Sequence, residues 1–287
     1  MIAKKSFGQH FLHDQSVIKK IIVAAEIKPG ETVLEVGPGH GVLTQALVAA
    51  GAKVIAVEAD RDLIPELQKR FGDKAEIVLS DILKFDFERT GDPTWSPVLL
   101  SSKQWRPHRA ASTYKLVANL PYNIATAVIE KFLSAKHPPT VLVVMVQKEV
   151  ADRMMAKPGD MSVLSVACQI YADLKRVTNV GPGAFNPPPK VDSTVVRLSL
   201  RAERSNPLFE IASSPVASRK DTDKEAVIGL AKAGFRSRRK LLKKNLEGAK
   251  WSKEAIKSAM DKACVDEMAR AQELSVEQWV QLWYNLA

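Results

Sequence analysis

The sequence predicts a doubly wound α/β domain with a mostly parallel, seven-stranded sheet, followed by a smaller all-α domain. Strand-like and helical segments alternate with short turns, which is typical of right-handed βαβ units. A glycine-rich turn follows the first buried strand, as in nucleotide-binding sheets. The expected strands are residues 32–36, 53–58, 75–79, 115–119, 140–146, 174–180 and 193–200.

Helices are expected between these strands. Apolar residues recur at helical spacing from Ser16 to Glu26, and Pro29-Gly30 ends that run. A second helix ends at Gly51, and Asp60 is placed to cap a third that reaches Phe71. Further helices are predicted from Ile124 and over residues 148–156 and 161–171.

We divide the chain into residues 1–200 and 201–287. Residues 90–113 are rich in Pro, Ser, Arg and Trp without a sustained period, so we interpret them as an inserted surface loop. Residues 201–221 are polar and contain two X-Pro pairs, which is typical of a linker. The region beyond them has a helical pattern throughout.

Composition favours a polyanionic partner. The 287 residues carry 42 Lys and Arg against 32 Asp and Glu, a net charge of +10. The longest apolar run, residues 140–146, is too short to cross a bilayer, and the first residues lack the apolar segment of a signal peptide. We therefore expect a soluble cytoplasmic protein and a monomer, with no membrane contact.

Neither a disulfide nor a metal site is expected. Cys168 and Cys264 are far apart in sequence, and we interpret both as buried apolar residues. The five histidines show no ligand spacing such as HExxH.

The ends of the first three strands indicate a nucleoside ligand. Gly37 and Gly39 lie in a GxGxG turn, and Pro38 removes an N–H that a pyrophosphate would need. Glu58 ends the second strand, where a carboxylate can accept both hydroxyls of a ribose. Asp81 follows the third strand and can accept a hydrogen bond from an adenine amine. For the glycines alone, the alternative is a tight turn that serves only packing. The glycine turn, Glu58 and Asp81 together predict an adenosine-containing cofactor.

The fourth strand ends in Asn119-Leu120-Pro121-Tyr122, the most specific signal in the sequence. Asn119 offers a neutral acceptor, and Pro121 holds Leu120 extended, so that its carbonyl can face the same crevice. Two such acceptors suit an exocyclic amine, and the Tyr122 ring gives the base a surface for stacking. Phe185 lies in a stretch stiffened by three prolines and can press on the same base.

Seven ordered blocks cover nearly all of the chain: FGQHFL at 7–12, EVGPGHG at 35–41, VEAD at 57–60, NLPYNI at 119–124, QKEVADR at 147–153, FNPPPKVDSTVVRL at 185–198 and FRSRRKLLKKNL at 235–246. With them the chain resembles the ribosomal RNA adenine dimethyltransferase family, the KsgA type, among the class I S-adenosylmethionine-dependent methyltransferases.

The resemblance implies a role for each matching residue. His10 and Leu12 would line the cofactor pocket, Gly37 and Gly39 would face the methionine moiety, and Glu58 would hold the ribose. Asp81 and Ile82 would hold the adenine. Asn119 would lie between the cofactor and the target amine, with Tyr122 and Phe185 on either side of the flipped adenine. Position 10 is His where many relatives have Asn.

The implied reaction transfers two methyl groups to each of two adjacent adenines in a hairpin near the 3′ end of small-subunit ribosomal RNA, on an immature small ribosomal subunit. Basic residues would contact the RNA, with the densest run expected to begin a helix. These residues are Arg236, Arg238, Arg239, Lys240, Lys243 and Lys244, with Lys148, Arg153 and Lys190 nearer the pocket.

Three alternatives stay open. The macrolide-resistance methyltransferases of large-subunit RNA share a similar Asn-x-Pro-Tyr, although the C-terminal basic block argues against them. A non-catalytic RNA-binding assembly or transcription factor could use the same fold, but the cofactor and NLPY residues are present. A nicotinamide-dependent oxidoreductase is disfavoured by the GxGxG spacing.

Overall fold

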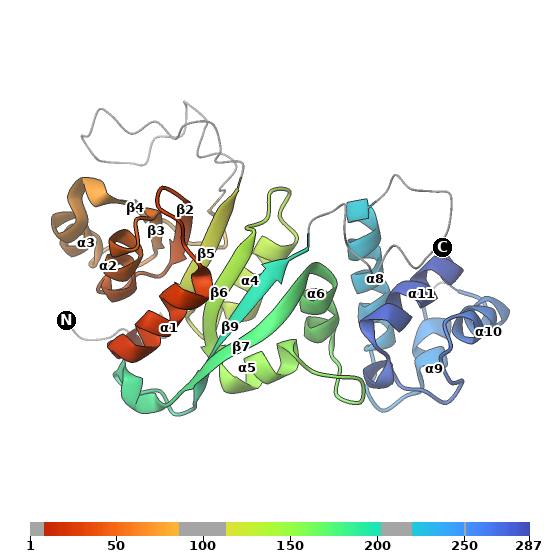
Figure 1. Cartoon of the computed structure of the whole chain (residues 1–287). Coiled ribbons are helices and arrows are strands. Elements are labelled where there is room, and N and C mark those ends of the chain that lie inside the picture. Colours follow the sequence, from red (N-terminus) through yellow and green to blue (C-terminus); the bar gives the residue numbers. More distant parts are fainter. Residues whose placement is uncertain (1–8, 86–112, 202–219, 250) are drawn as a thin grey trace. The chain divides into compact units, whose positions relative to one another are not determined.

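The computed structural model describes residues 9–85, 113–201, 220–249 and 251–287. They form two compact units (Figure 1). One comprises the chain up to Ala151 together with Lys175–Leu200, and the other comprises Asp152–Leu174 together with the chain from Arg201 onward. The predicted boundary after residue 200 coincides with one transition between the units, whereas residues 152–174 group with the C-terminal helices. The predicted insertion and linker fall almost entirely outside the described residues.

A seven-stranded sheet forms the centre of the first unit, in the order β4-β3-β2-β5-β6-β9-β7 (Figure 1). β2 pairs in parallel with β3 and β5, β3 with β4, and β5 with β6, while β9 is antiparallel to β6. This arrangement confirms the predicted fold class. The strands are β2 (Thr32–Val36), β3 (Lys53–Glu58), β4 (Ala75–Leu79), β5 (Tyr114–Asn119), β6 (Val141–Gln147), β7 (Ala172–Val180) and β9 (Ser193–Leu200).

Helices connect these strands, and α1 shows how the sequence sets them. Asp14 caps α1, because its Oδ1 accepts hydrogen bonds from the backbone N–H groups of Ser16 and Val17, at 2.8 and 3.3 Å. The helix buries its apolar face against β5, β6 and β9. The helices are α1 (Gln15–Ala25), α2 (Val42–Ala49), α3 (Ile64–Phe71) with a 3₁₀ turn at Gly72–Lys74, α4 (Ala125–Leu133) and α5 (Lys148–Met154).

The start of α3 differs from the prediction. We expected Asp60 to cap this helix, but the helix begins at Ile64. The Oδ1 atom of Asp60 instead accepts from Asp62 N at 3.1 Å and closes a turn before the helix. The predicted cap was therefore wrong, although the predicted end of the helix at Phe71 is confirmed.

A second, two-stranded sheet has no counterpart in the sequence prediction. β1 (Phe11–Leu12) pairs with β8 (Phe185–Asn186), which follows a 3₁₀ turn at Pro182–Ala184. This antiparallel pairing joins segments more than 170 residues apart and ties the N-terminal segment to the proline-rich stretch.

The second unit is helical. Trp279 is fully buried, and α11, which carries it, packs against α6, α8 and α10. The described residues confirm the predicted helical character of the C-terminal region. The helices are α6 (Val163–Tyr171), α8 (Lys220–Gly234), α9 (Leu242–Glu247), α10 (Lys253–Lys262) and α11 (Val276–Leu286), with a 3₁₀ turn at Ala271–Glu273.

The predicted helix over the basic run is wrong for most of its length. α8 ends at Gly234 and α9 begins only at Leu242, so Arg236 to Lys240 form the turn between the two helices. The buried Asn245 holds this turn, because its Nδ2 donates to the carbonyls of Gly234 and Ser237, at 2.6 and 3.0 Å. A buried amide thus replaces helical hydrogen bonds as the support of the basic segment.

The two cysteines differ in their surroundings. Cys168 is buried as predicted, whereas Cys264 is exposed, so that expectation was wrong. Cys264 follows α10 with a φ of 52°. Its N–H donates to Asp261 O, and Val265 N donates to Met260 O, at 3.1 and 2.9 Å. This is the Schellman ending of a helix, in which glycine is the preferred residue at the left-handed position.

We predict that Cys264→Gly stabilises the helical unit by about 1 kcal/mol, because glycine removes the steric cost of the left-handed backbone. The midpoint of thermal unfolding should rise. Ala263→Gly is the matched control, since φ is −84° there and glycine only adds entropy to the unfolded chain. Equal losses of stability in the two variants would contradict this account.

An ionisable residue lies inside the central sheet. Glu35 in β2 is 1% exposed, and its Oε2 has no hydrogen-bond partner among the described residues. Burial raises the pKa of Glu35 to about 8, and the nearby Glu58 carboxyl adds to the rise, while Thr44 opposes it. The neutral acid is therefore the favoured form over most of the physiological range.

The raised pKa of Glu35 makes stability depend on pH. The unfolded chain loses this proton near pH 4.5 and the folded chain near pH 8, so the unfolding free energy should fall between these values, by up to about 1.4 kcal/mol per pH unit. Glu35→Gln is neutral and should remove this part of the dependence. Urea unfolding at pH 5.5 and pH 8 tests this prediction. The free energy of unfolding of the variant should rise relative to that of the wild type between these pH values, and a constant difference would contradict the raised pKa of Glu35.

Candidate active site

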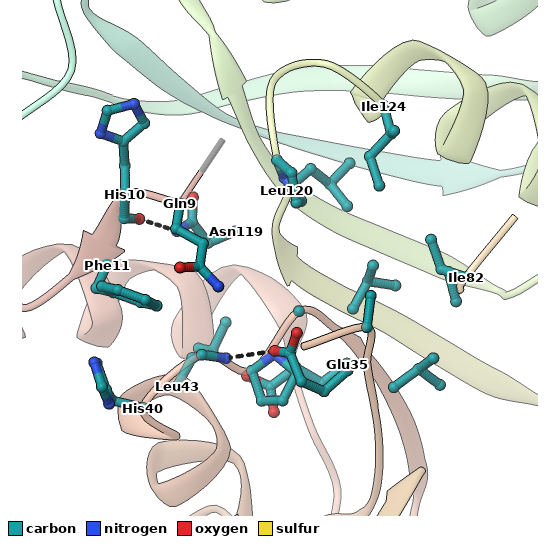
Figure 2. A pocket seen from close by; sticks show the side chains of 18 of the residues that line it. Gln9, His10, Phe11, Glu35, His40, Leu43, Ile82, Asn119, Leu120 and Ile124 are labelled. Carbon is teal, nitrogen blue, oxygen red and sulfur yellow. Dashed lines mark hydrogen bonds between the residues drawn. The ribbon is translucent and has the colours of Figure 1, made fainter. Parts of the chain in front are cut away.

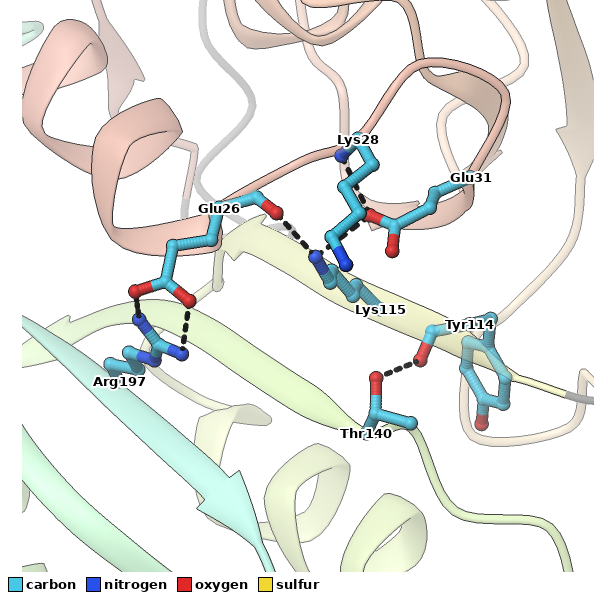
Figure 3. Close-up of polar contacts among 7 residues, drawn as sticks. All are labelled: Glu26, Lys28, Glu31, Tyr114, Lys115, Thr140 and Arg197. Carbon is cyan, nitrogen blue, oxygen red and sulfur yellow. Dashed lines mark hydrogen bonds and ion pairs between the residues drawn. The ribbon is translucent and has the colours of Figure 1, made fainter.

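A cavity of about 550 Å³ lies at the carboxyl ends of the parallel strands, entirely within the first unit (Figure 2). Its size suits a nucleoside-sized ligand. Segments that follow β2, β3, β4 and β5 line it together with the N-terminal segment, as the strand-end argument predicts. The predicted residues that line it are His10, Leu12, Gly37, Gly39, Glu58, Asp81, Ile82, Asn119, Leu120, Pro121 and Tyr122.

The glycine turn after β2 brings backbone to the cavity. Gly39 has a φ of +58°, and a Cβ there would lie 2.8 Å from the Phe11 ring. Gly41 has a φ of +74°, and a Cβ there would lie 2.4 Å from the Phe71 ring. The turn therefore serves two purposes: Gly39 exposes backbone beside the cavity, and Gly41, which does not line the cavity, allows close packing against α3.

Glu58 is fixed at the end of β3 by backbone donors. Its Oε1 accepts from Asp60 N at 2.8 Å and its Oε2 from Gly39 N at 3.2 Å. Burial raises the pKa of this carboxyl, and the two N–H groups oppose the rise. Each oxygen keeps a further lone pair, so the group can accept additional hydrogen bonds from a ligand in the cavity.

The segment after β4 adds a second acid. Ser80 N donates to Glu58 O at 2.9 Å, which holds this segment beside β3. The Oδ1 of Asp81 accepts from Leu83 N at 2.9 Å, and its side chain is exposed at the cavity rim. Ile82 is 4% exposed and supplies an apolar surface. A carboxylate beside an apolar side chain suits the edge and face of a purine.

Asn119 ends β5 with a defined amide orientation. Its Nδ2 donates to His10 O at 3.0 Å, a bond that Figure 2 shows crossing from the N-terminal segment to the strand end. Because a carbonyl can only accept, this bond assigns the nitrogen and leaves Oδ1 as an acceptor. The Leu120 N–H is satisfied by Met145 O at 3.1 Å. The described residues donate no hydrogen bond to Asn119 Oδ1.

Two rings form an aromatic wall of the cavity. The Tyr122 hydroxyl bonds Ser193 Oγ at 2.6 Å, which ties it to the first residue of β9. The His10 ring stacks on Tyr122, with centroids 5.6 Å apart and planes inclined by 29°. His10 Nδ1 also lies 2.8 Å from Pro187 O. The histidine at position 10 is therefore part of a stacked pair, a role that sequence reasoning did not predict.

Phe185 is not brought to the cavity. It is 3% exposed, belongs to the hydrophobic core of the first unit and pairs with Leu12 across β1 and β8. The long-range strand pairing turns the ring inward, which the local proline-rich sequence does not reveal. In this structure the ring contributes to packing below the site and lies outside the cavity lining.

Glu35 lines the cavity and was not predicted as a site residue. Figure 2 shows its carboxyl at the cavity floor, near Leu43. The signal was present in the sequence, because an acidic residue inside an apolar strand is costly unless it has a partner or a ligand.

The predicted RNA-binding cations lie outside the cavity lining. Lys243 pairs with Glu267 and Lys244 with Glu247, at 3.2 and 3.1 Å. The exposed members are Lys148, Arg153, Lys190, Arg236, Arg238, Arg239, Lys240 and Lys244.

The described residues also bear on metal sites and membrane-spanning helices. No group of three or more His, Cys, Asp or Glu side chains is arranged to hold a metal ion in that part of the chain. None of the helices seen there combines the length and apolar character that crossing a bilayer demands.

Comparison with known proteins agrees with this geometry. A relative from Dehalococcoides mccartyi, "Ribosomal RNA small subunit methyltransferase A", is 40% identical over 285 residues, covering 98% of this chain and 87% of its own. The crystal structure of a dimethyladenosine transferase from Plasmodium falciparum superimposes with a TM-score of 0.71 at 26% identity, covering 95% of this chain and 96% of that one.

The 23S rRNA methyltransferase ErmE has a TM-score of 0.68 at 24% identity, covering 96% of this chain and 99% of that one, which is a likeness of fold. The family profile described as "Ribosomal RNA adenine dimethylase" matches residues 2–287, so this chain belongs to the ribosomal RNA adenine dimethylase family.

Proposed function

We propose that this protein transfers methyl groups from S-adenosylmethionine to the N6 amines of two adjacent adenines in a 3′-terminal hairpin of small-subunit ribosomal RNA. The relatives named as small-subunit methyltransferases support this substrate over the large subunit. The fixed amide of Asn119 carries the proposal, because it presents a neutral acceptor in a cavity of nucleoside size. We further propose that the enzyme is a cytoplasmic monomer that acts on an immature small subunit.

The cavity residues fit the cofactor. S-adenosylmethionine carries positive charge, and two buried carboxyls, Glu58 and Glu35, line the cavity. Within the described parts of the chain, Glu35 Oε2 has no hydrogen-bond partner. Glu58 would accept the ribose hydroxyls, Asp81 the adenine amine, and Gly39 would face the methionine portion. Leu12 and Ile82 would contribute apolar contacts. When bound, the cofactor supplies a methyl group on a sulfonium, which is already an activated leaving group.

Asn119 and Leu120 would position the attacking amine. Asn119 Oδ1 and the Leu120 carbonyl accept its two N–H groups, which aims the nitrogen lone pair out of the conjugated ring. Orientation of this kind, together with exclusion of water, accounts for most of the rate because no covalent enzyme intermediate is needed. Transfer of the methyl group to N6 leaves a positively charged aminium, which is strongly acidic because its nitrogen is attached to an aromatic ring, so its proton can pass to water without a dedicated base.

The Tyr122–His10 pair would hold the extruded base. Stacking on an aromatic ring contributes about 1 to 3 kcal/mol, which offsets much of the cost of a few kcal/mol for unstacking a base. Pro121 would hold Leu120 extended. Phe185 would act indirectly, through the pairing of β8 with β1 in the N-terminal segment.

We predict that Asn119→Ala lowers kcat for methylation of purified small ribosomal subunits about 100-fold or more, since losing one preorganised polar contact typically costs this much. Cofactor affinity should change far less. Asn285→Ala removes an amide outside the cavity and should retain wild-type turnover.

Large subunits serve as the substrate control for this measurement. Incorporation into large subunits but not small ones would reject the proposed substrate. Near-normal turnover by Asn119→Ala on small subunits would reject the role of the amide.

We predict that Arg238→Glu with Arg239→Glu weakens RNA binding and flattens its salt dependence. Each lost phosphate contact should lower the slope of log affinity against log salt by about 1. Both side chains are exposed in the turn that Asn245 supports. Lys253→Glu with Lys262→Glu makes the same change in net charge on α10 and is the control. An unchanged slope in the first variant would exclude the turn from the RNA interface.

A further inference from the structure

A second hollow in the first unit, the α1–β7 groove, lies outside the cavity described above. It has a volume of about 530 Å³, and its lining includes the apolar side chain of Val23, which is 67% exposed. The groove is lined by Ser16, Lys19, Lys20, Val23, Ala24 and Glu26 of α1 and its end, Lys175, Arg176 and Val177 of β7, and Arg197 of β9.

The groove is strongly cationic. Five of its residues are Lys or Arg and one is Glu, which gives a formal net charge of +4. Glu26 is already engaged by both terminal nitrogens of Arg197, a pair that lowers the pKa of the Glu26 carboxyl. Among the described residues, the lining contains no second carboxylate beside Lys19, Lys20 and Lys175.

Protection of a sheet edge accounts for only part of this charge. β7 is the edge strand, and lysine or arginine on an edge strand discourages pairing with other chains. Lys19 and Lys20, however, come from α1 and face the same groove. Lys20 Nζ reaches across it and donates to Thr178 Oγ1 of β7, at 3.2 Å. Cations from two separate elements thus lie close together. They repel one another unless an anion binds between them.

The position of the groove relates it to the cavity. α1 begins three residues after Leu12, which lines the cavity, and its 11 residues span about 16 Å. A nucleic-acid strand that enters the cavity can therefore reach the groove within a few nucleotides. Phosphates would contact the Lys and Arg side chains of the groove, and sugar faces would contact its apolar residues.

We propose that the α1–β7 groove binds the phosphate backbone of the RNA that flanks the target adenines. This inference rests on the proposed function, since it takes ribosomal RNA as the substrate. RNA is favoured over an acidic protein because the chain's family acts on ribosomal RNA and because the groove lies along α1, the helix that begins three residues after Leu12 of the cavity.

Lys19→Glu with Lys175→Glu tests the groove. Both side chains are exposed, and neither has a role in the cavity. For a protein-free RNA of the 3′ hairpin with its flanking strands, the salt slope of binding should fall by about 2, and KM for methylation should rise about 10-fold with kcat nearly unchanged. Cofactor affinity should stay at the wild-type value.

Lys53→Glu with Lys74→Glu is the matched control. It makes the same change in net charge at the amino ends of two strands, whereas the cavity lies at the carboxyl ends. Lys53 is the first residue of β3 and Lys74 directly precedes β4, so KM should stay unchanged. Lys19→Arg with Lys175→Arg retains the charge and should bind as the wild type does, which separates an electrostatic effect from misfolding.

The outcomes are distinguishable. A salt slope and KM equal to those of the control pair would overturn the proposal, and so would a loss confined to protein-containing subunits, which would assign the groove to a ribosomal protein. Failure of the wild type to methylate any small-subunit substrate would reject the proposed function instead. The salt dependence of direct RNA binding would still show whether the α1–β7 groove contacts RNA.

Discussion

The hydrogen bond from Asn119 Nδ2 to the carbonyl of His10 is the constraint on which the reactive part of the cavity depends. It joins the end of β5 to the N-terminal segment, which β1 holds against β8. The bond fixes the amide so that Oδ1 is the remaining acceptor. It also fixes the backbone of His10, whose ring stacks on Tyr122. One contact therefore sets both the acceptor for an amine and the aromatic wall beside it.

The cavity has an acidic part and a neutral part. Glu58 and Glu35 are buried acids, and burial raises the pKa of both. The Glu58 carboxyl raises the pKa of Glu35 further, and Asp60 raises that of Glu58. A cationic ligand would relieve this cost, which explains why a fold would keep two acids in an apolar sheet. The strand-end segment of Asn119 to Tyr122 is neutral by contrast, as befits recognition of an uncharged base.

Much of the fold could be predicted because its signals are local. The strand-like segments, the glycine turn and the acids at strand ends are all visible in short stretches of sequence, and parallel strands bring their carboxyl ends to one edge. The failures come from contacts between distant residues. Pairing of β1 with β8 buries Phe185, and Asn245 supports a turn where the basic run had been expected to begin a helix. The α1–β7 groove likewise unites three segments that sequence alone does not place together.

The most direct test of the account is a structure of the enzyme with S-adenosylhomocysteine and an RNA hairpin that contains the target adenines. The account predicts that the extruded adenine stacks on the Tyr122–His10 pair, with its N6 about 3 Å from both Asn119 Oδ1 and the Leu120 carbonyl oxygen. An adenine whose N6 points away from these two oxygens, or an Asn119 amide rotated away from the base with the His10 bond broken, would contradict it.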